Sequence, residues 1–468
     1  MLLEFKAKNY KSFREELCLS MIPAPKQKDL EYSVMREKAG KTAYKALCSS
    51  VIYGPNASGK TNVISALDTF RSIVLRGDIE NVGSASGITN FPSLVLETIP
   101  NNTLENPRPV EFSISFLTQE TLIDYGFSID LGLFGPHEYD RKIVAERLFV
   151  NQKPIFTRDG NDVNVVVESL KLFPQFFDLN LAESVDIIRR LPGWKVDPKK
   201  LFLSNGFPSF FSPALHLLIV SWLLKSLYVF CRSDRLSVVV SDTDENIKNF
   251  IESNNRQPKP EEGMLFEDQY LSKAVSLIGA CNQIAYGYNT KSKKVQIVSV
   301  VLRKGDDFFA MPSQDFESNG TYRFINLFPL LKTVFVSGGT LVLDEFDASL
   351  HPMILMSIIN LFHNDEINRN HAQLIFNTHN PIFLNGDLFR RDEIKFVERN
   401  EQNSSELYAL SDFGTEGSRG VRKHEDYMRH YFMNRYGAIQ QVDFAPLFRK
   451  IMEDVQTGQE IRFNPEKE

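Results

Sequence analysis

The chain has 468 residues, which at roughly 150 residues per domain allows about three domain-sized units and excludes a peptide or a small disulfide scaffold. Its 43% hydrophobic and 24% charged residues are ordinary for a soluble globular protein. The 53 Lys and Arg against 59 Asp and Glu give a net charge of −6, so the overall charge does not attract nucleic acid or an anionic membrane. A nucleic-acid contact would need a local basic patch.

The cysteines and the most apolar stretch bear on the compartment of the protein. The four cysteines form no C-x-x-C pair and have no histidine at metal-ligand spacing, which argues against a zinc site or a disulfide framework. The first residues contain no signal-peptide core. Residues 211–230 are apolar, but Pro213, His216 and Lys225 favour a buried helix over a membrane span. These features predict a cytoplasmic protein without membrane contact.

The N-terminal part begins with strand patterns. Residues 2–19 alternate between apolar and polar positions, as in a hairpin, and residues 23–45 form a polar stretch that we expect to be exposed. Residues 47–53 are a short apolar strand that runs directly into a glycine. Residues 61–73 then have the apolar spacing of a helix.

The remainder of the chain changes from strands to helices and back. Alternating patterns predict an antiparallel meander, and with it a mixed sheet, from strands at 110–116, 125–131 and 143–150. Helical patterns dominate residues 168–285, which we interpret as an insertion. Strands separated by helices return at 295–302, 340–343 and 373–377. This alternation is typical of a parallel sheet, so the predicted fold class is α/β.

A phosphate-binding motif follows the first apolar strand. Residues 54–61, Gly-Pro-Asn-Ala-Ser-Gly-Lys-Thr, fit G-x-x-x-x-G-K-[ST] between a strand and a helix, which is the context that the motif requires. Glycines let the backbone N–H groups and the helix N-terminus face a polyphosphate, Lys60 reaches the β and γ oxygens, and the Thr61 hydroxyl binds Mg²⁺. The predicted nucleotide-binding residues are Gly54, Asn56, Ala57, Ser58, Gly59, Lys60 and Thr61.

Two carboxylates end a second apolar strand. In Leu341-Val-Leu-Asp344-Glu345, the first acid can hold Mg²⁺, and the second can orient or deprotonate the attacking water. Taken alone, such a strand could equally end in two solvated acids. The phosphate-binding motif elsewhere in the chain favours the functional interpretation, with Asp344 as a metal ligand beside Thr61 and Glu345 as a catalytic residue.

A histidine ends a third apolar strand. His379 follows residues 374–377, at the strand end where parallel sheets place their ligands. A single histidine at such a position is more often structural. Because it is the third polar group predicted at this edge of a phosphate-binding protein, we interpret His379 as a catalytic sensor of the γ-phosphate.

Together these motifs resemble the ABC-type ATPase head, and specifically the OLD-like, abortive-infection branch of AAA-type ATPases. In this resemblance, residues 54–61 are Walker A, Asp344-Glu345 ends Walker B, residues 347–352 with Asp347 are the D-loop, residues 377–381 are the H-loop, and residues 9–13 are a similar N-terminal motif. The resemblance implies ATP and Mg²⁺ as cofactors and ATP hydrolysis as the activity. It covers both ends of the chain and leaves out the middle.

The resemblance also implies a signature motif at the start of a helix before Walker B. Residues 317–321, Glu-Ser-Asn-Gly-Thr, occupy this place, and in the family the serine and glycine bind the γ-phosphate of ATP held by the other protomer. Ser318 and Gly320 would then complete an ATP sandwich in a homodimer or a higher homo-oligomer. Ser-Asn-Gly is also an ordinary helix start. The family's glutamine switch is not assigned, and residues 89–92 are a candidate by position only, so hydrolysis could be slow or partner-dependent.

The resemblance divides the chain into four parts. We expect residues 1–165 to form the N-terminal part of an ABC head, with a mixed sheet and Walker A, and residues 166–290 to form a mainly helical insertion. Residues 291–415 would form the C-terminal part of the head, with a parallel sheet core, the signature, Walker B, the D-loop and the H-loop. Residues 416–468 would form a basic and aromatic tail that docks a partner. Basic residues between 419 and 435 alternate with aromatic ones, which indicates a solvated face or protein docking surface more than direct nucleic-acid binding.

Similar ATPases in Septu, retron and PARIS-type antiphage systems hold a separately encoded nuclease or toxin. About ninety residues follow His379 without an acidic Asp-x-Asp cluster, so a fused TOPRIM nuclease is not expected. The leading hypothesis is the ATPase subunit of a two-component defence system, whose partner is an HNH, TOPRIM-like or RloB-like protein. The alternatives are an SMC- or recombination-type ATPase that acts directly on DNA, and a nucleotide-dependent scaffold with little turnover.

Overall fold

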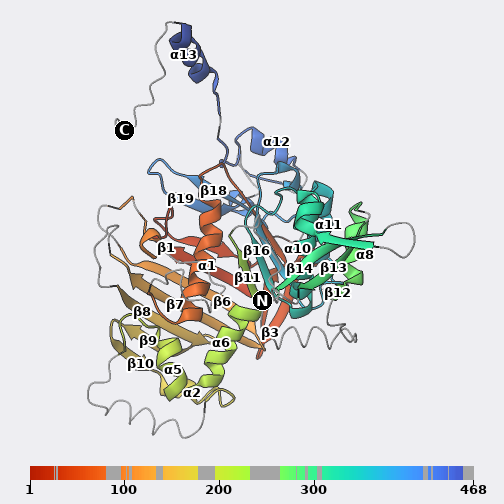
Figure 1. The fold of residues 1–468 in the computed structure, drawn as a ribbon. Coiled ribbons are helices and arrows are strands. Elements are labelled where there is room, and N and C mark those ends of the chain that lie inside the picture. The colour runs from red at the N-terminus through yellow and green to blue at the C-terminus, as the bar shows by residue number, and fades with distance from the viewer. Residues whose placement is uncertain are drawn as a thin grey trace.

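The computed structural model contains two large sheets that share one central helix (Figure 1). The described residues are 1–25, 27, 30–80, 96–101, 103–104, 108–132, 141–177, 196–231, 264–280, 282–289, 294–302, 308–414, 420–422, 425–440 and 442–456. Among these residues, no helix is both long enough and apolar enough to cross a membrane. Residues 211–230 contain the helix α6 (Pro213–Lys225), which buries one face with Ile219 and Trp222 and exposes Leu217.

The first sheet has seven strands and is antiparallel throughout. Its spatial order is β10-β9-β8-β7-β6-β1-β2. In chain order, the strands are β1 (Leu2–Lys8), β2 (Leu17–Ser20), β6 (Val110–Thr118), β7 (Thr121–Asp130), β8 (Lys142–Val150), β9 (Lys153–Asp159) and β10 (Asp162–Val165). Two-residue turns of left-handed backbone, Gln119-Glu120 and Asn151-Gln152, join consecutive strands as hairpins. The pairing of β6, β7 and β8 confirms the predicted antiparallel meander, but the sheet is antiparallel throughout and not the mixed sheet that the sequence also predicted.

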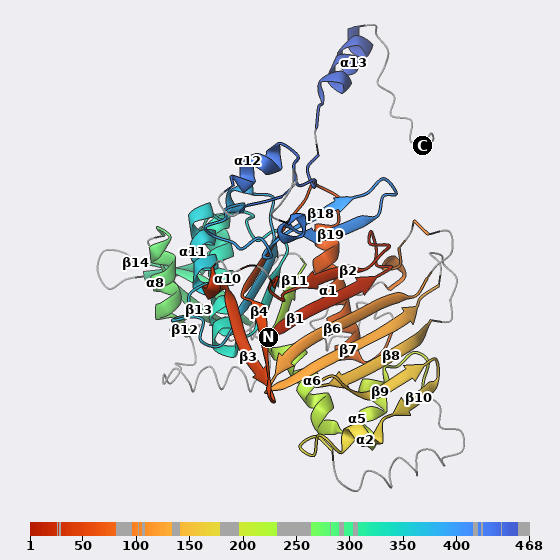
Figure 2. The same ribbon diagram turned by 180° about the vertical axis from the view of Figure 1, so that it is seen from behind.

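Two helices cover one face of this sheet. α1 (Lys60–Arg76) and α6 lie across it in Figure 1, and Figure 2 shows the opposite face. Phe70 of α1 stacks on Phe127 with ring centroids 5.4 Å apart, and Trp222 of α6 stacks on Phe116 at 3.8 Å. Aromatic side chains spaced to match the strand alternation therefore anchor both helices to the sheet.

The second sheet is the core of the molecule and is the mixed one. Its order is β11-β16-β17-β5-β18-β19, and every neighbouring pair except β18 and β19 is parallel. The strands are β5 (Ser49–Tyr53), β11 (Leu227–Phe230), β16 (Thr340–Leu343), β17 (Gln373–Asn377), β18 (Ile394–Arg399) and β19 (Ser405–Ala409). In a parallel sheet, the carboxyl ends of β5, β16 and β17 meet at one edge, as the sequence predicted.

Both faces of the core sheet are covered. Val342 and Ile375 face the cluster that contains α1 and the seven-stranded sheet, whereas Leu341 and Leu374 face α10 (Asn319–Ser337) and α11 (Pro352–Phe362). Alternate residues of each strand thus enter two different hydrophobic cores. This explains why these strands are continuously apolar in the sequence.

The described residues of the segment 166–290 contain strands as well as the predicted helices. Its first part contains α2 (Val167–Leu170), α4 (Phe202–Asn205), α5 (Phe207–Phe210) and α6, and Phe207 lies fully buried in the core. β11 then joins the core sheet beside β16. After it come β12 (Met264–Glu267), α8 (Gln269–Leu277) and β13 (Gln283–Asn289), and the two strands pair in a four-stranded antiparallel sheet with β14 (Lys294–Leu302) and β15 (Phe308–Pro312).

The remaining elements are short. The polar stretch 23–45 includes most of an antiparallel ribbon, β3 (Val34–Ala39) with β4 (Thr42–Leu47). The other helices among the described residues are η1 (Glu31–Ser33), η2 (Leu96–Thr98), α9 (Ser313–Phe316), η4 (Pro381–Phe383), η5 (Leu410–Phe413), α12 (Tyr427–Phe432) and α13 (Ala445–Gln456). Figure 1 shows α13 standing clear of the two-sheet body, and its Leu447, Phe448 and Met452 are exposed.

Candidate nucleotide-binding site

The phosphate-binding loop turns from β5 into α1, as the motif predicted. A Cβ on Gly54 would lie 2.2 Å from the Val397 carbonyl oxygen, and one on Gly59 would lie 2.6 Å from Ser405 Oγ. Both positions therefore exclude any larger residue, since β18 and β19 pack directly against the loop. Gly59 also begins α1 without a side-chain cap. The first N–H groups of the helix are thus available to an anionic ligand.

Lys60 is held at the centre of the loop. Its Nζ donates to the carbonyl oxygens of Gly54 at 2.7 Å and Pro55 at 2.9 Å, and the residue is 6% exposed. Burial lowers the pKa of Lys60 to about 8, against the opposing effect of the nearby carboxylates Asp344 and Glu345. The ammonium is therefore mostly charged at pH 7, but it loses its proton far more readily than an exposed lysine does.

Asp344 lies at the end of β16 beside Thr61. Its Oδ1 accepts a hydrogen bond from Thr61 Oγ1 at 3.1 Å and a second, short one from Asn377 Nδ2. Burial raises the pKa of Asp344, and these two hydrogen bonds oppose that rise. The structure thus brings together the two predicted Mg²⁺ ligands, which come from elements 283 residues apart in the chain.

Glu345 is the exposed residue next to this carboxylate. Its backbone is left-handed, with a φ of 51°, and its N–H donates to Asn377 Oδ1 at 2.6 Å. Asn377 therefore holds both acids, since its amide also donates to Asp344. The sequence analysis missed Asn377, although it is the one polar residue in the otherwise apolar second half of β17 and directly precedes Thr378-His379.

His379 reaches the same edge from β17. Burial lowers the pKa of His379, and the charge of Lys60 lowers it further, so the imidazole is neutral at pH 7. A neutral imidazole can donate one hydrogen bond to a phosphate oxygen without adding a full positive charge.

One cavity of about 270 Å³ gathers these side chains. It is lined by Asn56, Ala57, Ser58, Gly59, Lys60, Thr61, Asn62, Asp344, Glu345, Asn377, His379 and Arg399. Among the predicted site residues, Gly54, Ser318, Gly320 and Asp347 are not among its lining residues. The three strand ends and the loop therefore converge around one polar space.

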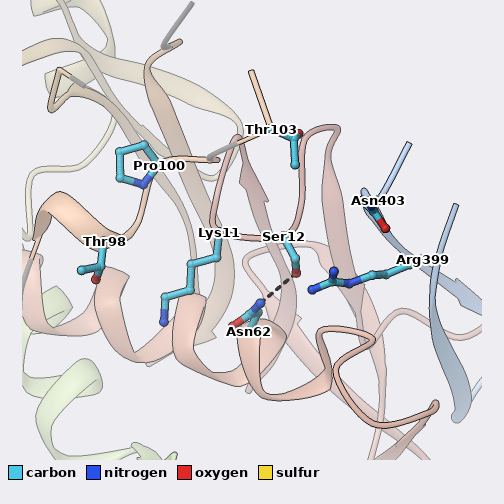
Figure 3. A pocket seen from close by; sticks show the side chains of 8 residues that line it. All are labelled: Lys11, Ser12, Asn62, Thr98, Pro100, Thr103, Arg399 and Asn403. Atoms are coloured by element: carbon cyan, nitrogen blue, oxygen red, sulfur yellow. Dashed lines mark hydrogen bonds between the residues drawn. The ribbon is translucent and has the colours of Figure 1, made fainter. Parts of the chain in front are cut away.

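A second cavity of about 370 Å³ adjoins the first and shares Asn62 and Arg399 with it. Figure 3 shows its lining, which is Lys11, Ser12, Asn62, Thr98, Pro100, Thr103, Arg399 and Asn403. Asn62 Nδ2 donates to Ser12 Oγ at 2.8 Å, so the N-terminal motif contacts the first turn of α1. Arg399 was missed by the sequence analysis because it comes from the β18–β19 hairpin, which only the sheet order places beside the loop.

The predicted signature begins α10. Ser318 caps this helix by accepting the Thr321 N–H at 3.2 Å, and a Cβ on Gly320 would lie 2.5 Å from the Ser349 carbonyl oxygen. Neither residue lines the two cavities of its own chain.

Two features predicted from the sequence include residues outside the described part of the chain. The glutamine-switch candidate, residues 89–92, lies outside the described residues, as do Arg419, Lys423 and His424 of the basic run. Tyr427 and Tyr436 of that run are buried in the core, and Arg435 pairs with Glu425 at 3.0 Å. These two aromatic side chains therefore do not form an open stacking surface for bases.

The fold and the loop between β5 and α1 define a P-loop protein of the AAA ATPase class. The chain belongs to the family described as "AAA domain, putative AbiEii toxin, Type IV TA system", which matches residues 49–166 and 232–385, more than half of the chain. No curated protein matches the sequence.

Solved structures with similarity to the chain include Smc head domains. The first is an Smc head bound to the C-terminal winged-helix domain of ScpA, with 13% identity, a TM-score of 0.40, and coverage of 87% of this chain and 97% of that one. The second is an Smc head with an extended coiled coil from Pyrococcus furiosus, bound to the C-terminal domain of ScpA. The third is an Smc head with a coiled coil and joint from Pyrococcus yayanosii. They have identities of 11% and 10%, TM-scores of 0.39 and 0.36, and each covers 87% of this chain and 96% of the other. At these values, nothing about the function of this chain follows from the likeness.

Proposed function

We propose that this protein binds ATP with Mg²⁺ across the two adjoining cavities and hydrolyses it. The observation that carries the proposal is the convergence of Lys60, Thr61, Asp344, Glu345 and His379 on one cavity. A lysine at the start of a helix with uncapped N–H groups binds phosphates, and paired acids with a neutral histidine are suited to a hydrolytic step.

The residues present fit a magnesium ion. The Thr61 hydroxyl and the Asp344 carboxylate are hard oxygen donors within hydrogen-bond distance of each other, and these two groups would hold the ion. When bound, Mg²⁺ offsets the negative charge of the phosphates. Glu345, exposed at the cavity, would orient the attacking water and accept its proton, and His379 would hydrogen-bond the terminal phosphate.

The second cavity supports a place for the nucleoside. The two cavities meet at Asn62 and Arg399, so a ligand whose phosphates lie on the loop would extend past these residues. Lys11 and Ser12 would then line the ribose and base end. Arg399 would place its guanidinium near the phosphate chain, where it can form charge-assisted hydrogen bonds.

The sandwich arrangement belongs to the same proposal. Ser318 and Gly320 lie away from the cavities of their own chain, and the family resemblance assigns this motif to the ATP of a second protomer. Asp347 follows Walker B as the D-loop residue and would lie at the same interface. The active form would therefore be a homodimer or a higher homo-oligomer.

We infer that the biological role is that of an ATPase subunit of a two-component antiphage defence system. The family description, with its reference to an AbiEii toxin and a type IV toxin–antitoxin system, supports a role of this kind. The partner would be a separately encoded nuclease or toxin, of HNH, TOPRIM-like or RloB-like type. The helix α13 in the segment 416–468 supports a docking role for the tail, because it stands clear of the body with exposed Leu447, Phe448 and Met452.

The test separates binding from turnover. Affinity for a fluorescent ATP analogue and phosphate release would be measured for the wild-type protein, Lys60→Ala and Glu345→Gln. We expect Lys60→Ala to lose binding, and Glu345→Gln to keep binding while turnover falls by about 100-fold or more. Absence of nucleotide binding by the wild-type protein would refute the ATPase proposal. Unchanged turnover in Glu345→Gln would remove Glu345 from the mechanism, and slow wild-type turnover that Glu345→Gln does not alter would favour a nucleotide-dependent scaffold.

A further inference from the structure

The β18–β19 hairpin contacts the phosphate loop through a buried serine. The hairpin lies beside α1 in both views of the molecule (Figures 1 and 2). Ser405, the first residue of β19, is 2% exposed, and its Oγ donates to the backbone carbonyl oxygen of Ser58 at 2.5 Å. The Ser405 N–H donates to the carbonyl oxygen of Ser12 at 2.7 Å, which fixes the backbone that carries this hydroxyl. The hairpin therefore places one fixed donor against one carbonyl of the loop.

This contact sets the direction of a neighbouring backbone N–H. The Ser58 carbonyl and the Gly59 N–H belong to the same peptide group, and in a planar trans peptide they point in opposite directions. Because the carbonyl oxygen points toward Ser405, the Gly59 N–H points away from the hairpin. Both Ser58 and Gly59 line the cavity of about 270 Å³. An N–H at the start of a helix beside such a cavity is a donor for a phosphate oxygen.

The same peptide could rotate if the hairpin did not hold it. Gly59 has a φ of 113°, a backbone conformation that residues with side chains rarely adopt. Because glycine populates both signs of φ readily, a flip of the Ser58–Gly59 peptide meets little resistance from the glycine itself. A flipped peptide would turn the partial negative charge of the carbonyl oxygen, in place of the N–H, toward the phosphates and weaken their binding.

We infer that Ser405 is a positioning residue for nucleotide binding, which keeps the Ser58–Gly59 peptide in the orientation that binds phosphate. The inference rests on the proposed function, in which the loop binds the phosphates of ATP. It goes beyond that function because Ser405 lies outside the phosphate-binding motif and outside the residues that the family matches, 49–166 and 232–385. Ser405 is not among the lining residues of the two cavities, so it acts on the ligand through the loop.

The neighbouring Ser404 supplies a matched control. It is also 2% exposed, and its Oγ accepts the Arg14 N–H at 3.1 Å, so Ser404→Ala removes a buried hydrogen bond of the same hairpin that does not involve the loop. We expect Ser405→Ala and Ser404→Ala to lower the denaturant midpoint of unfolding by similar amounts, since each loses one buried hydrogen bond. Only Ser405→Ala should weaken ATP binding, by about tenfold in Kd. Equal ATP affinity in the two variants would overturn the inference.

The second measurement separates binding from the chemical step. In full-length Ser405→Ala, KM for ATP should rise while kcat stays within about threefold of wild type, because the loop binds the phosphates equally before and during hydrolysis. Affinity for ADP should fall by about the same factor as affinity for ATP, since both nucleotides place phosphates on the loop. Ser405→Cys keeps a weaker donor and should lie between Ser405→Ala and wild type. A fall in kcat without a loss of affinity, or an unchanged affinity for ADP, would contradict the positioning role.

The failure of this inference is distinguishable from the failure of the proposed function. A wild-type protein that binds neither ATP nor ADP would overturn the proposed function itself. Wild-type nucleotide binding that Ser405→Ala leaves unchanged would overturn the positioning role alone. Ser405→Cys and Ser404→Cys change the side-chain volume less and repeat the same comparison if an alanine variant does not fold.

Discussion

Polar residues at the two ends of the core strands β5, β17 and β18 have different surroundings. At the amino end, Ser49 Oγ donates to Glu393 Oε1 at 2.7 Å and contacts His363 Nε2 at 2.8 Å, and all three residues are buried. Glu393 Oε2 also accepts the Arg390 N–H at 2.8 Å. The side chain of Gln373, the first residue of β17, makes four hydrogen bonds to the surrounding chain.

At the carboxyl end, the side chains of Lys60, Glu345 and His379 line a cavity instead. The difference distinguishes the polar groups that stabilise the fold from those that we expect to contact a ligand. Polar groups at the amino end are satisfied by one another, as buried groups must be. Those at the carboxyl end line a cavity, at the edge where parallel sheets bind ligands.

The amino-end cluster also includes Cys48, whose thiol lies within 4.8 Å of ligand atoms of His363 and Glu393. No metal-ligand spacing is visible around this cysteine in the sequence, because the three residues are far apart in the chain. Ser49 and the Arg390 N–H already satisfy Glu393 through hydrogen bonds, and burial raises the pKa of the Cys48 thiol, which keeps it protonated. The cluster therefore has a structural role, because its buried contacts connect β5 with the ends of α11 and β18.

The largest effect that sharpens this comparison is expected from Asn377→Ala. It removes the hydrogen bonds to the Asp344 carboxylate and to the Glu345 N–H, so both acids lose their support. We expect kcat for ATP hydrolysis to fall about 10- to 100-fold, as for other outer partners of a metal ligand. Steady-state phosphate release measures this. Asn380→Ala, three residues further on, is the control, and equal rates in the two variants would contradict the role of Asn377.

The second effect concerns pH and the carboxyl end. Because burial lowers the pKa of Lys60 to about 8, its ammonium is charged below that pH and neutral above it. Affinity for ATP should be constant below pH 8 and fall by up to about tenfold per pH unit above it, since the bound phosphates favour the protonated form. Titration of ATP binding from pH 6.5 to 9.5 would show this. Lys60→Arg stays charged over the range and should lose the dependence, and a wild-type affinity that is flat to pH 9.5 would argue against it.

The third effect should separate stability from activity at the amino end. Glu393→Ala leaves Ser49, His363 and the Arg390 N–H without their shared acceptor, and we expect a loss of about 2–3 kcal/mol in the free energy of unfolding. The folded protein should still bind ATP with wild-type affinity. Denaturant unfolding and nucleotide binding measure the two quantities, and exposed Glu401→Ala is the control. If Glu393→Ala lost more ATP affinity than its lower fraction of folded protein explains, the two ends of the strands would not have separate roles.

The smallest effect is expected from Arg399→Ala. Its guanidinium borders both cavities, so it should contribute to nucleotide binding equally before and during the chemical step. We expect KM for ATP to rise about three- to tenfold with kcat nearly unchanged, and Arg399→Lys to lie between. A large fall in kcat would instead place Arg399 in the hydrolytic step.

Much of the site could be predicted because strand ends are visible in a sequence. Asp344 and Glu345 end one short apolar run, His379 follows a second run after Asn-Thr, and Lys60 ends the glycine-rich loop that follows a third run. Parallel pairing then brings these residues to one edge. Asn377 is the last residue of such a run. An asparagine at this position indicates the end of a strand, and nothing in the sequence indicates that its amide contacts two acids.

Other features depended on contacts that no local pattern records. Arg399 and Lys11 come from hairpins far from the phosphate loop in the chain, and only the three-dimensional packing brings them to its side. β11 was interpreted as part of a helical segment because its four residues continue the apolar run of α6. Its strand conformation follows from pairing with β16, which lies more than a hundred residues later.

The most direct test of the account is the mass of Glu345→Gln in solution, measured with and without Mg-ATP beside Glu345→Gln/Lys60→Ala. Slowed hydrolysis should trap ATP between two heads, so the account predicts that the mass doubles only with ATP and only when Lys60 is present. The same oligomer in every condition would contradict the ATP sandwich, and with it the assignment of Ser318 and Gly320 to the second protomer's nucleotide.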